Sequence, residues 1–117
     1  MSLDKKIIDF SELEVRLQKF ADDRDWQKYH SPKNLAMALS AEVGELVEIF
    51  QWRTEVESKT LADSPELARP VRNELADVLL YLVRLSSVLG VDLNEAVTHK
   101  LIANAQKYPQ GDSTPSR

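Results

Sequence analysis

The sequence contains no cysteine, so disulfide scaffolds, thiolate metal sites and cysteine nucleophiles are excluded. Its 117 residues include only three glycines and five prolines, which favours long regular elements over a turn-rich β fold. No stretch reaches the roughly 18 to 20 apolar residues of a membrane span. The opening MSLDKKIIDF also lacks the apolar run and the small-residue cleavage site of a signal peptide. We therefore expect a cytoplasmic protein that does not associate with membranes.

Positive charge is also in short supply. The chain has 15 Lys and Arg against 19 Asp and Glu, a formal net charge of −4. This balance disfavours a surface that grips nucleic acid through its phosphates, so we expect no nucleic-acid partner. A small phosphate-bearing ligand is compatible with the charge if a cation mediates its binding.

Residues that start and stop helices predict an all-α chain with four helices. Ser11 and Asp92 each stand three residues before a glutamate, which is the pattern of a capping box. Ser31 and Ser64 each precede a proline, which suits the first position of a helix. Gly90 suits the end of the third helix. The predicted helices cover about residues 12–25, 32–55, 65–89 and 93–108.

The third predicted helix has apolar side chains around most of its circumference. They are Leu75, Val78, Leu79, Leu80, Leu82, Val83 and Leu85. A helix that is apolar on nearly all sides is buried on nearly all sides, which a chain of 13.3 kDa can rarely achieve alone. We therefore predict a four-helix bundle completed by oligomerisation, as a dimer or a dimer of dimers. Residues 1–109 are predicted to form one domain, with 110–117 as a flexible C-terminal tail.

Two pairs of acids lie on the second and third predicted helices. Glu42 and Glu45 form one pair, and Glu74 and Asp77 form the other. Residues three apart project from one face of a helix, so each pair directs two carboxylates the same way. Both pairs stand among apolar residues, and both helices are expected to share a core. Glu48 suits the solvated side of its helix and is not assigned to the site.

Burying such carboxylates together is costly unless their charge is compensated. The acids could be protonated, paired with Lys or Arg, or bound to a divalent cation. Arg53 and Arg72 stand at no helical pairing distance from Glu42 or Glu45, whereas Arg84, seven residues after Asp77, leaves local pairing open. Oxygen ligands without cysteine or a suitably spaced histidine favour Mg²⁺ or Mn²⁺.

Two other interpretations apply to the same acids. Acidic pairs at this spacing are also common on solvated helix faces. A di-iron carboxylate bundle would need Glu-x-x-His motifs, and neither His30 nor His99 stands three residues after a glutamate.

The acidic motif resembles that of the MazG-like all-α nucleoside triphosphate pyrophosphohydrolases. The segments FADDRDWQKYHSPKNLAMALSAEVGELVEIFQW, ELADVLLYLVRLSSVLGVDLNEAV and KLIANAQKYP resemble the dCTP pyrophosphatase branch of that family. The resemblance covers roughly residues 15–109. The wider family often has two adjacent glutamates where this chain has Ala41 and Glu42, and the branch tolerates a small residue at the first position.

The resemblance implies Mg²⁺-dependent hydrolysis of a nucleoside triphosphate, dCTP or a related pyrimidine dNTP, to the monophosphate and pyrophosphate. A water activated by the metal would attack the α-phosphorus. The implied cellular role is house-cleaning of the nucleotide pool. The family further implies a dimer, often assembled into a homotetramer, with active sites at subunit contacts.

The resemblance also assigns roles to individual residues. Glu42, Glu45, Glu74 and Asp77 would hold one or two Mg²⁺, with Mn²⁺ as a substitute. Among them Glu42, Glu45 and Asp77 are the catalytic candidates, and we expect Glu45 to be the general base. The candidates for substrate binding are Trp26, His30, Asn34, Trp52, Tyr81, Lys100, Asn104 and Tyr108. Each of these also has a purely structural interpretation, in the core, at an oligomer contact or in solvent.

Two competing functions remain open from the sequence. One is a non-enzymatic, oligomeric helical interaction module whose acids only keep its surface polar. The other is a pyrophosphohydrolase that acts on other or modified nucleotides.

Overall fold

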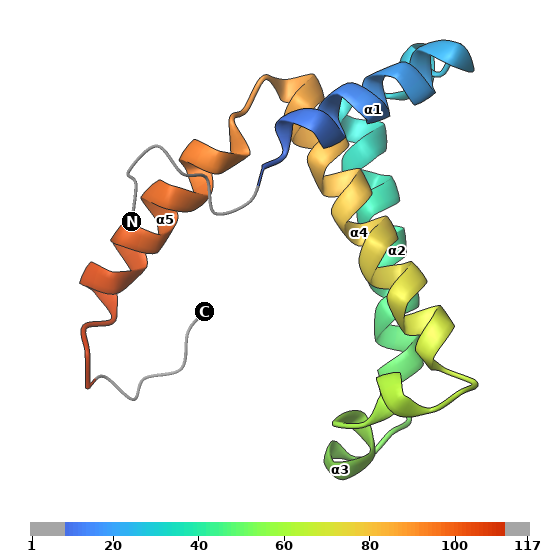
Figure 1. Cartoon of the computed structure of the whole chain (residues 1–117), viewed down its shortest axis with the longest axis vertical. Helices are drawn as coiled ribbons and strands as arrows, with labels where there is room; N and C mark the ends of the chain where they lie inside the picture. The colour runs from blue at the N-terminus through green and yellow to red at the C-terminus, as the bar shows by residue number, and fades with distance from the viewer. Residues whose placement is uncertain (1–8, 112–117) are drawn as a thin grey trace.

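A computed structural model describes residues 9–111, and all regular structure within that range is helical (Figure 1). The α-helices are α1 (Ser11–Asp23), α2 (Pro32–Phe50), α3 (Glu55–Ser58), α4 (Ala68–Leu89) and α5 (Leu93–Lys107), and the 3-10 helices are η1 (Gln27–Tyr29) and η2 (Leu61–Asp63). The predicted all-α class is confirmed for this part of the chain. None of the helices in the described range is both long and apolar enough to cross a membrane.

Helices α2 and α4 form the body of the structure. They lie side by side and run in opposite directions, and α1 packs against α4 near one end of the pair (Figure 1). Helix α5 leaves the end of α4 and extends away from the pair (Figure 1). The buried apolar side chains are Phe10, Ala21, Leu35, Leu61, Val71 and Val83. This core is small because only two long helices face each other along their length.

Many apolar side chains therefore remain exposed on the single chain. Met37 and Val47 on α2 are 63% and 53% exposed, and Leu75 on α4 is 53% exposed. Leu101 and Ile102 on α5 are also more than half exposed. These exposed apolar side chains agree with the apolar helix pattern from which we predicted an oligomer. The oligomer itself stays a prediction.

Three of the predicted helix boundaries agree with the structure. Ser31 caps α2, because its hydroxyl oxygen accepts a hydrogen bond of 3.1 Å from the backbone N–H of Asn34. Asp92 caps α5 in the same way, through the backbone N–H of Glu95 at 3.1 Å. Gly90 ends α4 with a φ of +73°, a left-handed conformation that glycine adopts at no steric cost.

The predicted caps of the first and third helices are wrong. Ser11 is the first residue inside α1, and its backbone N–H donates to the carboxylate of Asp9 at 2.9 Å. Ser64 ends η2, so α4 begins only at Ala68 and has no side-chain cap. A serine before a proline is therefore not sufficient to start a helix when a 3-10 turn already occupies the preceding residues.

The ends of the first two helices were also predicted too far along the chain. Helix α1 stops at Asp23, and Asp25 adopts a positive φ of 56°. Helix α2 stops at Phe50, and Thr54 then starts the separate helix α3. Thr54 and Glu57 form a reciprocal capping box, with hydrogen bonds of 2.9 and 3.1 Å. Within the predicted tail, residues 112–117 lie outside the described part of the chain.

The different roles of Ser31 and Ser64 give a prediction about stability. Replacing Ser31 with alanine removes the cap of α2 and is expected to lower the free energy of unfolding by about 1 kcal/mol. Ser64→Ala is the matched control, because no helix depends on that side chain as a cap. Urea denaturation followed by circular dichroism measures both. Equal losses in the two variants would contradict the assignment.

Candidate metal and nucleotide site

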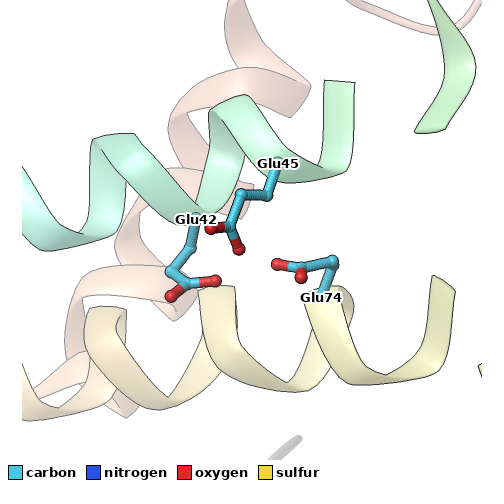
Figure 2. A group of neighbouring side chains, drawn as sticks. All are labelled: Glu42, Glu45 and Glu74. Atoms are coloured by element: carbon cyan, nitrogen blue, oxygen red, sulfur yellow. The ribbon is translucent and has the colours of Figure 1, made fainter. Parts of the chain in front are cut away.

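Three carboxylates converge between α2 and α4. Glu42 and Glu45 on α2 point toward Glu74 on α4 (Figure 2). One carboxylate oxygen from each residue lies within 4.8 Å of the other two. The spacing of three residues places Glu42 and Glu45 on the inner face of α2, and the opposite direction of α4 brings Glu74 against them. We call this group the acidic triad.

Within residues 9–111, the acidic triad has no ion pair to a Lys or Arg side chain. Each of Glu42 and Glu74 has one buried carboxylate oxygen, Oε2, that finds no hydrogen-bond donor in the described range. The ion pairs recorded there join Arg16 to Glu12, Lys19 to Asp23 and Lys28 to Asp25, all before α2. The acids are therefore not neutralised by Lys or Arg within residues 9–111, which was one of the three ways considered from the sequence.

The crowding changes the proton affinities of the triad. The pKa of Glu42 is raised from 4.5 to about 7, first because a proton on it can be shared with Glu74, and then by burial and by Glu45. The pKa of Glu74 is also raised. The hydrogen bond from Glu42 acts to lower the pKa of Glu74, but burial and the nearby Glu45 and Asp77 outweigh it. The triad therefore favours whatever supplies positive charge, a proton or a cation.

These residues fit a divalent metal ion. The donors are all hard carboxylate oxygens, and two of those oxygens are buried with no hydrogen-bond partner among the described residues. Mg²⁺, Mn²⁺ and Ca²⁺ prefer such ligands. The acidic triad could thus hold a metal ion.

Asp77, the fourth predicted metal ligand, is not part of this group. It lies three residues after Glu74 on α4, and its charge contributes to the raised pKa of Glu74. Its side chain lines a neighbouring cavity instead. Its role as a ligand stays a prediction.

That neighbouring cavity brings together several of the predicted nucleotide-binding residues. It has a volume of about 180 Å³ and is mostly apolar. Its lining residues are Leu17, Phe20, Trp26, His30, Asp77, Leu80, Tyr81 and Arg84. We call it the Trp26 cavity. Of the residues predicted to contact the base or sugar, it contains Trp26, His30 and Tyr81.

Trp52 lies in a different hollow. It is 85% exposed and borders an open groove of about 810 Å³ that Glu45 and Glu74 of the acidic triad also line. The groove is lined by Glu45, Glu48, Ile49, Trp52, Arg53, Leu67, Pro70 and Glu74. Within one chain, Trp26 and Trp52 therefore do not line the same cavity. Glu48, which we left outside the site from the sequence, borders this groove beside Glu45 and Glu74.

The other candidates lie apart from the cavity or are used locally. The Asn34 side-chain amide donates to the backbone carbonyl of Tyr29 at 3.2 Å, so one of its groups is already engaged. Lys100, Asn104 and Tyr108 belong to α5 or its end, and α5 extends away from the helix pair that carries the triad (Figure 1). The structure therefore does not bring these three residues to the triad within one chain.

Arg84 is a residue of the site region whose place there was not predicted from the sequence. Arg84 lines the Trp26 cavity and is only 5% exposed. From the sequence it was considered only as a partner for Asp77, and no ion pair between the two forms in the described structure. The helical spacing held a usable hint, because Asp77, Tyr81 and Arg84 stand four and then three residues apart and so share one face of α4.

The raised pKa of Glu42 predicts a pH-dependent stability in protein treated with a chelator. Between about pH 4.5 and 7 the native state binds more protons at Glu42 than the unfolded state does, so stability from this group is present at low pH and is lost as pH rises. Glu42→Gln, which cannot ionise, is expected to be more stable than the wild type above pH 7.

The advantage of Glu42→Gln should vanish below about pH 4.5, where Glu42 is protonated in both states. Thermal melting across this range measures the difference, with Glu66→Gln, an exposed acid outside the triad, as the control. A wild type that is the more stable of the two at high pH would contradict the prediction.

The chain is thus an all-α protein whose paired helices carry a carboxylate cluster that could hold a metal ion. Residues 37–115 match the MazG-like family, and the chain belongs to that family. The match includes the acidic triad and Asp77 and begins after Trp26 and His30.

Named relatives agree with this assignment. The chain is 46% identical over 91 residues to dCTP pyrophosphatase 1 of Mus musculus and to that of Homo sapiens. These matches cover 78% of this chain and 54% of each relative, so the chain spans about half the length of these relatives. A crystal structure of a pyrophosphatase from Archaeoglobus fulgidus has a TM-score of 0.79 and 41% identity, covering 93% of this chain and 100% of that one.

Proposed function

We propose that this protein hydrolyses a nucleoside triphosphate, dCTP or a related pyrimidine dNTP, to the monophosphate and pyrophosphate with Mg²⁺ as cofactor and Mn²⁺ as a substitute. The observation that carries the proposal is the acidic triad, with its two buried carboxylate oxygens that have no donor within residues 9–111. The relatives named dCTP pyrophosphatase 1 and the neighbour described as a pyrophosphatase support the reaction and the substrate. The cellular role would be removal of unwanted nucleotides from the cytoplasmic pool.

Glu42, Glu45, Glu74 and Asp77 are the residues that would hold the metal. A bound Mg²⁺ would neutralise phosphate charge and lower the pKa of a coordinated water. Glu42 and Glu74 are half-buried and fixed between the helices, whereas Glu45 is exposed. Glu45 is therefore the member of the triad best placed to contact water.

The chemistry assigned to the protein is proton transfer and positioning. Water adds to the α-phosphorus, the bond from that phosphorus to the bridging oxygen breaks, and pyrophosphate leaves. The carboxylate of Glu45 takes the proton that the water loses. Trp26, His30 and Tyr81 would hold the base and sugar in the Trp26 cavity. Asn34 would offer its side-chain amide to the nucleotide.

The remaining candidates lead us to propose a shared active site. Lys100, Asn104 and Tyr108 would contact the phosphates and sugar, but α5 extends away from the triad of its own chain (Figure 1). A second copy could supply these residues, and also Trp52, while covering the exposed apolar side chains of α2, α4 and α5. We propose a dimer, or a dimer of dimers, built from a domain of residues 1–109.

The proposal is tested with a panel of dCTP, dTTP, dUTP, dATP and dGTP in the presence of Mg²⁺, measuring pyrophosphate and monophosphate. We expect both products in equal amounts, fastest from a pyrimidine dNTP, and no turnover after chelation. Release of orthophosphate and a diphosphate, or no turnover of any triphosphate, would refute it.

Thermal melting separates the enzyme from a non-enzymatic interaction module. Mg²⁺ together with a non-hydrolysable dNTP analogue should raise the melting temperature more than either alone, because a ligand that binds only the native state stabilises it. An interaction module without a nucleotide site predicts no shift.

A further inference from the structure

Two residues that line the Trp26 cavity, His30 and Arg84, belong to a hydrogen-bonded chain of three side chains. The Arg84 Nε–H donates to Nδ1 of His30 at 3.0 Å, and an Nη1–H donates to Oε1 of Gln18 at 2.7 Å. The Gln18 amide nitrogen in turn donates to Asp22 at 2.8 Å, so both ends of that amide are fixed. Neither contact follows from the helix pattern, because they join α4 to α1 and to the segment before α2.

Arg84 is a buried cation that forms no ion pair with a carboxylate in the described part of the chain. Its side chain is enclosed, yet within residues 9–111 its recorded partners are the neutral groups of His30 and Gln18. A guanidinium carries five N–H groups, and the hydrogen bonds to His30 and Gln18 use two of them. Arg84 also lines the cavity. A ligand in the cavity could therefore accept hydrogen bonds from the donors that remain.

The same hydrogen bond fixes the protonation of His30. A guanidinium can only donate, so Nδ1 of His30 must be an unprotonated acceptor, and the proton of the neutral ring must be on Nε2. Burial, and then the charge of Arg84, lower the pKa of His30, which keeps the ring neutral. The ring is also held edge-on by Trp26, with centroids 6.1 Å apart. His30 is thus a donor of fixed orientation.

We infer that Arg84, positioned by Gln18 and positioning His30, gives the Trp26 cavity a pair of hydrogen-bond donors that selects a base with two adjacent acceptors, cytosine rather than uracil. This inference rests on the proposed function, since it assigns base recognition to the same site. Cytosine presents O2 and N3 as neighbouring acceptors. Uracil has an N–H at position 3, which would face donors and leave them unpaired. A buried site built to pair specific groups rejects an analogue that leaves them unpaired much more strongly than an apolar pocket does.

Selectivity is tested by binding, so that the result does not depend on turnover. The probes are the α,β-imido analogues of dCTP and dUTP with Mg²⁺, measured by calorimetry. We expect the wild type to bind the cytosine analogue at least about 10²-fold more tightly, and Arg84→Met to reduce that ratio at least about 10-fold. If Arg84→Met does not fold, Arg84→Lys carries the same test, because lysine cannot donate to His30 and Gln18 with a fixed fork.

The protonation of His30 is a second readout that a merely structural role for Arg84 would not predict. Nitrogen NMR of the wild type at neutral pH should show His30 protonated on Nε2 alone, with His99 as an exposed reference. In Arg84→Met, His30 should populate both tautomers. The inference would be overturned if the wild type bound the cytosine and uracil analogues equally well, or if the ratio of the two affinities were unchanged in the Arg84 variants. A proton on Nδ1 of His30 would also overturn it. Discrimination in binding without any turnover would instead refute only the proposed reaction.

Discussion

Replacing Glu45 with alanine is expected to lower the rate of triphosphate hydrolysis at least about 10²-fold, the usual cost of losing a positioned general base. The physical reason is twofold. Glu45 is the exposed member of the acidic triad and the proposed acceptor of the water proton, and its carboxylate is also one of the oxygens that converge within 4.8 Å. Loss of pyrophosphate release in a fixed-time assay, followed by steady-state kinetics, measures the effect.

The fold should survive this change, because removing one of three crowded acids relieves repulsion. Circular dichroism and thermal melting check this, and in chelator-treated protein Glu45→Ala is expected to be no less stable than the wild type. Glu66→Ala is the matched control, since Glu66 is exposed and lies outside the triad, and it should retain wild-type activity. Full activity in Glu45→Ala would remove Glu45 from the catalytic machinery.

Mixing two inactive variants is expected to restore activity if the site is shared between subunits. Lys100 lies on α5, away from the triad of its own chain (Figure 1), whereas Glu45 belongs to the triad. A dimer of one Glu45→Ala chain and one Lys100→Ala chain would then contain one intact site and one doubly altered site. After subunit exchange at equal amounts, about a quarter of the wild-type rate should return.

The control for this experiment uses two acids that lie in the same triad. Glu45 and Glu74 approach each other within one chain, so a mixture of Glu45→Ala and Glu74→Ala should stay inactive. Native mass spectrometry verifies that mixed dimers have formed. Recovery in the control, or none in the test mixture once exchange is complete, would contradict a site that is shared in this way.

The parts of the fold that the sequence predicts well depend on local chemistry. Ser31 followed by a proline fixes the start of α2, and Gly90 fixes the end of α4, because caps and left-handed turns involve residues close in sequence. The convergence of Glu42, Glu45 and Glu74 was predicted from helical periodicity and from apolar neighbours. Both inferences need only the geometry of single helices and the assumption that two apolar faces meet.

The parts that were missed depend on competition or on long-range contacts. The end of α2 was placed beyond Phe50 because apolar periodicity does not reveal that the Thr54–Glu57 box starts a new helix. The role of Arg84 could not be predicted because Gln18 lies 66 residues away in sequence and on another helix. The position of α5 away from the triad follows from no local pattern either.

The uncovered apolar faces of α2, α4 and α5 also bear on the life of a newly made chain. Before it assembles into the proposed oligomer, such a chain exposes apolar surface that proteases and chaperones recognise. The waiting time shortens as expression rises, because encounter is a second-order process. If assembly protects these faces, the fraction of new chains that escape degradation should increase with protein concentration. A given decrease in synthesis rate should then lower the amount of assembled protein by a larger factor.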